Sequence, residues 1–434
     1  MHAGFGARDI TPKIGSWLNG FIARLTPGTA IDIQLTARAL WLEDERTTCL
    51  IISLDILGLS TSFADQLTQT LASRLNLPES HIVISCTHNH SGPMTCRLRG
   101  IGPADEEYLR LLESQVYEVA SAAAESKRPV EVSWGESPLE ISLNRRQIDP
   151  LSGKSVLGFN PNGPTDRGVR VLHLRSDNVS TVLFTYACHP YCLGPEHSLI
   201  SPDFPGHAVA MLEARGHQAL FLNGCCGDLA PRRSCEGPDA ARSEGEIIAD
   251  AVLNACQNAK VDESPQLEAD SIRFFLAQDD LPPFEVLESE LKQSDSTVRP
   301  EDREDQRVLA RIRAAWDEWL KDLRQVSEHG RRLPSVPTRV SLMRIGQGAI
   351  VALPGEPFYE IGQRIAAHIG ANPVCVAAYC HGYIGYVPTR EAYAQGGYEV
   401  DESHRYVSLW RIHPDTEEIL TKHVDLLSAS LSSN

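Results

Sequence analysis

The sequence predicts an α/β fold built from layered mixed sheets with flanking helices. Short apolar runs typical of buried strands recur along the chain, at positions 40–42, 49–54, 82–84, 130–134, 169–174, 181–186 and 348–353. Stretches typical of amphipathic helices, with apolar residues three and four positions apart, lie at positions 62–75, 106–126, 207–214, 245–259 and 359–369. Strands and helices mixed in this way favour a layered α/β domain. The sequence shows no internal repeat.

The composition excludes several classes of protein. The 57 acidic and 40 basic residues give a formal charge of -17, which repels nucleic-acid phosphates and anionic lipid headgroups. The N-terminal residues lack the pattern of a signal peptide, and no apolar run approaches the ~20 residues that a membrane helix needs. We therefore expect a cytoplasmic protein with a small-molecule substrate, no nucleic-acid partner and no stable membrane association.

The 11 cysteines are scattered and include no CxxC pair. This spacing argues against a disulfide framework and against a cysteine-based zinc site. We expect most of these cysteines to be buried thiols.

Residues 281–332 differ from the rest of the chain because they are highly charged and rich in helix formers. A proline-containing break at Val298, Arg299 and Pro300 divides them. We predict a charged helical hairpin inserted into a single domain that spans residues 1–434. Since charge runs usually mark a solvated face, its simplest role is packing or contact with a second copy in a homo-oligomer.

Polar residues of catalytic types follow apolar runs at five places. These stretches are THNHSGP at 87–93, CHP at 188–190, NGCCGDLAP at 223–231, LPGEP at 353–357 and GYIGYVPTREAYAQGGYE at 382–399. Loops at the carboxyl ends of strands are where open α/β sheets bind ligands. Histidine nitrogen and carboxylate oxygen are donors that zinc prefers. From the residues alone, a metal site and ordinary structural loops are equally good interpretations of these stretches.

These stretches, taken in order together with Asn144 and Arg145, resemble the motifs of the neutral, non-lysosomal ceramidase family. The resemblance runs from Ile10 to the end of the chain, apart from the helical insert, and implies the fold of that family's catalytic domain. Tyr386 and Tyr398 keep the family's spacing of twelve residues.

The resemblance implies a site for a single zinc ion, with the ligands His88, His189, Glu356 and Tyr398. It also implies that three further residues line the site beside the scissile amide, namely His90, Tyr386 and Arg145. In the competing assignment, both histidines of the HxH motif bind the metal.

These roles fit metal-assisted hydrolysis. Zinc lowers the pKa of a bound water from about 15.7 toward ~7 and polarises a carbonyl group. His90 could take a proton from water or give one to the leaving group. Tyr386 or Arg145 could stabilise the developing oxyanion.

The chain departs from the family at three points. It has Ala230 where the family has a serine that contacts the polar head of the substrate, so a covalent mechanism through that serine is excluded. It also lacks the family's C-terminal β-sandwich and any visible export signal. We therefore expect a zinc-dependent hydrolase of a small amide or related acyl compound. The alternatives are hydrolysis of ceramide itself, metal-assisted isomerisation or elimination on a polyol or sugar acid, and a binding protein with a vestigial site.

Other polar residues are secondary candidates. We expect Asp228 to anchor the glycine-rich turn by accepting backbone hydrogen bonds. Asp55 and Asp203 are candidates for orienting a ligand histidine. His381 is a candidate pocket residue. The remaining histidines near the second motif, His197 and His207, fit exposed loop or helix-start positions.

Overall fold

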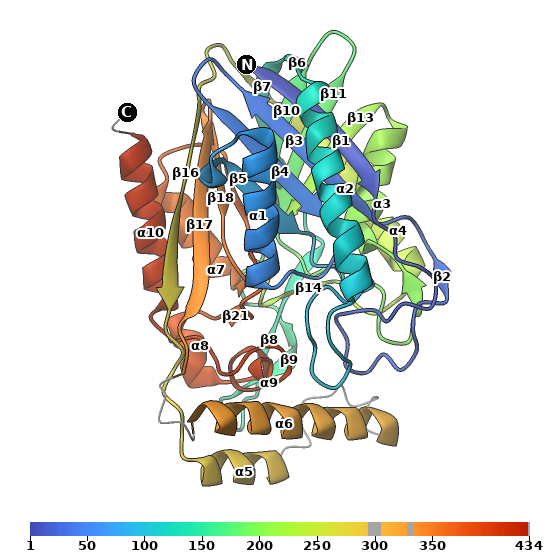
Figure 1. Cartoon of the computed structure of the whole chain (residues 1–434), viewed down its shortest axis with the longest axis vertical. Coiled ribbons are helices and arrows are strands. Elements are labelled where there is room, and N and C mark those ends of the chain that lie inside the picture. The colour runs from blue at the N-terminus through green and yellow to red at the C-terminus, as the bar shows by residue number, and fades with distance from the viewer. Residues whose placement is uncertain (294–304, 328–332, 433–434) are drawn as a thin grey trace.

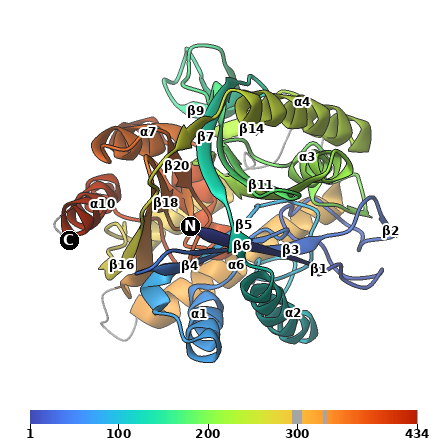
Figure 2. The same cartoon turned by 90° about the horizontal axis from the view of Figure 1, so that it is seen from above.

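The computed structural model describes residues 1–293, 305–327 and 333–432 (Figure 1). Within these residues, three mixed sheets of four or five strands surround a shared core. Each of them carries a pair of helices on its outer face, as the view from above makes clear (Figure 2). The predicted fold class, mixed sheets with flanking helices, is confirmed.

The first unit comprises residues 2–129 and its sheet has the order β5-β4-β3-β1-β6. Strands β1, β3 and β4 are antiparallel, and β5 lies parallel to β4 after the crossover helix α1. Helix α2 then packs on β1 and β3. The elements are β1 (His2–Asp9), β3 (Thr36–Glu43), β4 (Thr48–Leu54), α1 (Thr61–Leu75), β5 (Ile82–Cys86), α2 (Glu106–Glu125) and β6 (Arg128–Pro129).

The second unit, residues 131–262, repeats this order as β13-β11-β10-β7-β15. Here too the first three strands are antiparallel, and the fourth lies parallel to the third after a crossover helix. The elements are β7 (Glu131–Pro138), β10 (Gly168–Arg175), β11 (Ser180–Tyr186), α3 (Asp203–Ala214), β13 (His217–Asn223), α4 (Pro238–Gln257) and β15 (Lys260–Asp262).

The third unit, residues 267–431, has the order β20-β18-β17-β16, with the same directions and the same two helices. Its elements are β16 (Leu267–Leu276), β17 (Val336–Ile345), β18 (Gly348–Ala352), α7 (Tyr359–His368), β20 (Val374–Ala377) and α10 (Thr416–Leu431). The chain therefore repeats one topology three times, a repeat that its sequence pattern does not reveal.

The three units share a core and a ring of hydrogen bonds. Leu40, Leu172 and Met343, one from the second strand of each unit, are fully buried in the same cluster. At the ends of the fourth strands, the amide of Ala378 donates to the carbonyl of Asn223 (2.8 Å), and the Asn223 side chain donates to the carbonyl of Thr87 (3.1 Å). The amide of Cys86 donates to the carbonyl of Tyr379 (3.1 Å), which closes the ring.

The topology also decides where each unit can be elaborated. Because the second strand runs back antiparallel to the first, the connection between them lies at the carboxyl end of the first strand. The third and fourth strands end on that same side. This connection holds β2 (Ala30–Ile31) in the first unit and β8 (Ser142–Ile148) with β9 (Ser155–Asn160) in the second. In the third unit it holds the helices α5 (Phe284–Gln293) and α6 (Gln306–Ser327).

Smaller elements complete the same end of the molecule. They are β12 (Leu199–Ile200), β14 (Leu229–Pro231), β19 (Glu356–Pro357), β21 (Tyr386–Val387), α8 (Arg390–Gln395), a π-helical turn at Tyr398–Glu402 and α9 (His404–Val407). The 3₁₀ turn Glu79–His81 leads into the start of β5, at the opposite end. Figure 1 shows α8, α9 and β21 directly above α6.

The predicted insert corresponds to α5 and α6, whereas its predicted break at residues 298–300 lies outside the described residues. Nine of the eleven cysteines are buried, as expected from their scattered spacing. Among the helices that the structure describes, none has the length and apolar character of a membrane span.

The ring of hydrogen bonds between the units predicts that the Asn223 side chain stabilises the folded protein. Replacing it in Asn223→Ala removes the hydrogen bond to the carbonyl of Thr87 and leaves that buried acceptor unpaired. We expect the free energy of unfolding to fall by about 1–3 kcal/mol in urea titrations. The exposed Asn178 is the control, and Asn178→Ala should stay within about 0.5 kcal/mol of the parent. Equal effects of the two substitutions would contradict the role of the ring.

Candidate metal centre and active site

Three of the four predicted ligands come from three different units. His88 follows the fourth strand of the first unit (β5), His189 follows the third strand of the second unit (β11), and Glu356 follows the third strand of the third unit (β18). All three strands end on the same side of the molecule, so the topology itself brings these residues together.

The two histidines converge on one oxygen of the carboxylate. Nε2 of His88 lies 3.2 Å from Oε2 of Glu356, and Nε2 of His189 lies 3.1 Å from the same atom. All three side chains are almost completely buried. The donor set of two imidazole nitrogens and one carboxylate oxygen is one that zinc prefers.

Backbone carbonyls fix which nitrogen of each histidine faces the carboxylate. Nδ1 of His88 lies 2.8 Å from the carbonyl of Leu57, and Nδ1 of His189 lies 2.8 Å from the carbonyl of Cys226. Because a carbonyl only accepts hydrogen bonds, both Nδ1 atoms carry the hydrogen and both Nε2 atoms are left with a lone pair in the neutral ring.

The lone pairs therefore face one another without a hydrogen between them. Burial, together with the charge of Arg145, lowers the pKa of His189 to about 4, which keeps its ring neutral. Within the described chain, neither Nε2 of His189 nor Oε2 of Glu356 has a hydrogen-bond partner. A bound cation would satisfy all of these atoms, so the residues fit a metal ion.

His90 lies beside this cluster with its ring unengaged. Its ring centroid is 5.1 Å from that of His88 and 5.4 Å from that of His189. One ligand atom of each of these histidines lies within 4.8 Å of the others, so the three imidazoles could hold a metal ion. Both ring nitrogens of His90 are buried and make no hydrogen bond to the described residues. Burial and the neighbouring His88 and His189 hold the pKa of His90 well below 6.5, so the ring is neutral at pH 7.

The backbone around the histidines is strained. His88 and Tyr379 adopt φ values of +65° and +57°, in the left-handed region that residues other than glycine rarely enter. Their rings stack with a centroid distance of 4.0 Å. Gly20 has φ +105°, and a Cβ atom there would lie 2.7 Å from the Cβ of His90. Strain of this kind persists where the surroundings hold a functional geometry in place.

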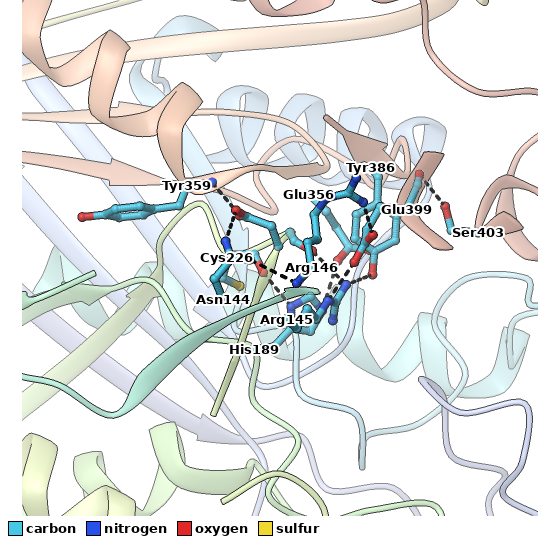
Figure 3. Close-up of polar contacts among 12 residues, drawn as sticks. Asn144, Arg145, Arg146, His189, Cys226, Glu356, Tyr359, Tyr386, Glu399 and Ser403 are labelled. Atoms are coloured by element: carbon cyan, nitrogen blue, oxygen red, sulfur yellow. Dashed lines mark hydrogen bonds and ion pairs between the residues drawn. The ribbon is translucent and has the colours of Figure 1, made fainter. Parts of the chain in front are cut away.

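Arg145 and Arg146 on β8 share one buried carboxylate (Figure 3). Nε of Arg145 donates to Oε1 of Glu399 (2.9 Å), and Nη1 of Arg146 donates to Oε2 (2.6 Å). Arg145 also donates through Nη2 to the carbonyl of Gly227 (2.8 Å) and to the hydroxyl of Tyr386 (3.0 Å). Two guanidinium groups and one carboxylate leave a net positive charge beside the metal site.

The two predicted tyrosines occupy different positions around Glu356. Strand β21 pairs with β19 in parallel, with Tyr386 directly opposite Glu356. The Tyr398 ring lies edge-on to the Tyr386 ring, with a centroid distance of 5.9 Å. Burial and the charge of Glu356 raise the pKa of Tyr386, and the charge of Arg145 opposes them. Burial, the neighbouring Tyr406 and the charge of Glu356 raise the pKa of Tyr398.

Sequence reasoning gave no role to several residues of the site. The hydroxyl of Tyr383 donates to Oε1 of Glu356, the oxygen that faces away from the histidines. Glu399 anchors both arginines, and Tyr379 supports the His88 ring. Tyr383 and Glu399 lie within the tyrosine-rich stretch, and this position was the one sequence feature that could have marked them as site residues. Nothing in the sequence pattern marked Tyr379.

The secondary acidic candidates have structural contacts. Asp228 accepts from the amide of Tyr359 at the start of α7 (2.8 Å) and from the side chain of Asn144 (2.9 Å), and burial raises its pKa to about 6. The prediction that Asp55 or Asp203 orients a ligand histidine is wrong, because carbonyl groups do so. Asp55 accepts from the amide and hydroxyl of Thr36.

The remaining candidates lie away from the carboxylate. Asp203 accepts from the amides of Cys192 and Leu193, and so shapes the loop that follows His189. Nε2 of His381 lies 2.8 Å from the hydroxyl of Ser341 on β17. Two other histidines have acidic neighbours, His197 beside Glu196 and His207 beside Asp32.

Comparison with known proteins places this geometry in a family. The profile of the family described as neutral/alkaline non-lysosomal ceramidase, N-terminal, matches residues 1–272. No curated protein sequence matches the chain. The structure of neutral ceramidase from Pseudomonas aeruginosa is similar, with a TM-score of 0.72 at 18% identity, over 99% of this chain and 75% of that one. A ceramidase complexed with C2 matches with a TM-score of 0.74 at 18% identity, over 100% of this chain and 75% of the other. The chain therefore belongs to the neutral/alkaline non-lysosomal ceramidase family.

Proposed function

We propose that this protein is a zinc-dependent hydrolase that cleaves the amide bond of a small N-acyl compound. The observation that carries the proposal is the convergence of two imidazole lone pairs and a carboxylate oxygen at one buried point. Family membership supports amide hydrolysis as the reaction. Zinc bound there supplies an acidified water and polarises the carbonyl group of the substrate.

His88, His189 and Glu356 are the proposed protein ligands. A phenol oxygen completes the set, and two tyrosines compete for this role. The family resemblance implies Tyr398. The pairing of Tyr386 opposite Glu356 favours Tyr386 instead, because residues directly paired on neighbouring strands have adjacent side chains. We propose Tyr386 as the phenol ligand, with Tyr398 packing against it.

His90 is the proposed proton carrier. Its neutral ring has a free lone pair at pH 7 and no competing hydrogen bond among the described residues. It takes a proton from the attacking water, whose oxygen bonds to the carbonyl carbon. It returns this proton to the amine nitrogen as the C–N bond breaks.

Arg145 is proposed to stabilise the negative charge that develops on the carbonyl oxygen. It is fixed at Nε by Glu399 and at Nη2 by Gly227 and Tyr386. A donor held in place before the reaction loses no free energy to reorganisation when charge develops. Arg145, Arg146 and Glu399 together carry a net positive charge, which attracts the negative charge of an oxyanion.

A small substrate in the cytoplasm is the proposed context. The charge of -17 disfavours nucleic acid and anionic membranes as partners. Ala230, on β14 beside β8, offers no hydroxyl group to a polar lipid head. Assembly into a homo-oligomer through the helical insert stays a prediction.

Metal content tests the separate roles of His88 and His90. We expect the variants His88→Ala, His189→Ala and Glu356→Ala to purify without stoichiometric zinc. His90→Ala should keep its zinc and lose activity by about 10²–10⁴-fold, because only the proton carrier is missing. Elemental analysis per chain and initial rates provide the two readouts, with the exposed His368→Ala as control. If His90→Ala loses zinc as completely as His88→Ala, both histidines of the HxH motif bind the metal.

Two tyrosine variants test which phenol is the ligand. Tyr386→Phe removes the hydroxyl group opposite Glu356 and should weaken zinc binding by about 10-fold or more, measured by competition with a chelator. Tyr398→Phe keeps that hydroxyl and should bind zinc as the parent does. The reverse result would assign the ligand to Tyr398.

Hydrolysis in ¹⁸O-labelled water tests the reaction class and the substrate together. The zinc-loaded enzyme should release a carboxylate carrying ¹⁸O from short N-acyl amides, and a chelator should abolish this release. We expect kcat/KM for a long-chain ceramide to be lower by at least about 10-fold. Product without ¹⁸O would point to isomerisation or elimination. A preference for ceramide would overturn the small substrate and leave the hydrolase intact.

A further inference from the structure

The helical insert packs against the end of the molecule that holds the active site (Figure 1). The apolar side of α6 is buried in a cluster with Met94 and Leu98 from the loop after His90, and with Tyr406 from α9. Gly100 in the same loop approaches the helix so closely that a Cβ atom would lie 2.7 Å from the carbonyl of Arg311. The insert is therefore in direct contact with two segments that leave the site.

The position of the insert within the third unit also places it beside the active site. The connection between the first two strands of each unit lies on the side where the site is built. In the first unit this connection supplies Arg24, whose Nη1 donates to the carbonyl of His90 (2.5 Å). In the second unit it supplies β8 with Arg145. The α5–α6 insert is the corresponding connection of the third unit.

Arg99 links α6 to the segment that follows Glu399. This side chain is almost completely buried, and its Nε and Nη2 donate to Oδ2 of Asp322 on α6 (3.1 and 3.0 Å). Its Nη1 donates to the carbonyls of Arg405 (3.2 Å) and Ser408 (2.9 Å). Asp322 thus holds the guanidinium group in the orientation that binds both carbonyls.

Those carbonyls belong to the segment that carries the site residues. The amide of Ser403 donates to the carbonyl of Tyr398 (2.9 Å), and its hydroxyl donates to the carbonyl of Glu399 (3.1 Å). The π-helical turn and α9 therefore form one continuous segment, residues 398–408. Its start anchors Arg145 through Glu399, and its end is held by Arg99.

A second link joins α6 to the other side of the site. Nη1 of Arg311 donates to the carbonyl of Arg24 (2.6 Å), and Arg24 in turn binds the carbonyl of His90. Helix α6 thus contacts both the loop of the proposed proton carrier and the segment that anchors the proposed oxyanion donor.

From these contacts we infer that the insert is a part of the active site, and that Asp322 and Arg99 are positioning residues that set the placement of Glu399 and hence of Arg145. The inference rests on the proposed function for its consequence in catalysis. It gives the insert a role that neither its charge pattern nor its solvent exposure suggests.

The variant Asp322→Ala tests the inference in the zinc-loaded chain of residues 1–434. Helix α6 tolerates alanine, which is the best helix former. We expect amide hydrogen exchange in residues 398–408 to accelerate by about 10-fold or more, while the strands of the three sheets exchange at the parent rate. Zinc content should stay unchanged. With an amide substrate, kcat should fall by roughly 10–100-fold with little change in KM, because the placement of a donor and not substrate affinity is altered.

Two further variants make the result specific. Asp322 also accepts from Nη1 of Arg97 (3.3 Å), whose Nη2 pairs with Glu318 on the same helix face. Glu318→Ala removes that neighbouring ion pair, leaves Arg99 bound to Asp322, and should behave as the parent. Asp322→Glu keeps a carboxylate for Arg99 and should restore most of the lost kcat and exchange protection.

Parent-like exchange in 398–408 for Asp322→Ala would overturn the inference, as would equal effects of Glu318→Ala or faster exchange throughout the sheets. The hydrogen-exchange readout needs no substrate. If the parent protein hydrolyses no amide, the proposed function fails while the exchange data still decide whether Asp322 positions the segment.

Discussion

The closed ring of hydrogen bonds among Thr87, Asn223 and Ala378 is the constraint on which the site depends. Buried amides and carbonyls must be paired, so the ends of β5, β13 and β20 have little freedom to move apart. His88 follows its ring position by one residue, and Cys226, whose carbonyl orients His189, follows Asn223 by three. A shift at any of the three strand ends would separate groups that must meet within a few ångströms.

The electrostatics of the site follow from what surrounds each charge. Carbonyl groups, and not carboxylates, face Nδ1 of the two proposed ligand histidines, which directs Nε2 of each ring toward Glu356. The carboxylate of Glu399 forms ion pairs with both Arg145 and Arg146. One negative charge shared by two guanidinium groups fixes Arg145 in place and leaves the three groups with a net positive charge. Glu356 is thus the buried carboxylate at the proposed metal site, and Glu399 is the buried carboxylate that positions the proposed oxyanion donor.

The sequence pattern predicted several of the strands and helices, because apolar periodicity is a local signal, but it gave no sign of β1, β16, β17 or α10. It placed α3 and α4 later than they begin, since their first turns contain Pro205 and Pro238 and the apolar repeat starts after them. It missed the threefold topology because the units share strand order and not residues. It also missed Tyr383 and Glu399 as partners, since their contacts to Glu356 and Arg145 cross many residues of chain and have no local signature.

The threefold arrangement has a consequence for how the folded chain would respond to its ion. Each unit contributes one of the proposed ligands His88, His189 and Glu356, so a fragment lacking any unit would retain no complete set of them. By mass action, an ion bound only to the finished assembly lowers the population of every partly unfolded form, whichever unit opens first. Occupancy at the centre would then add to the coupling that the shared core and the ring of hydrogen bonds already provide, and chelation would weaken all three units at once.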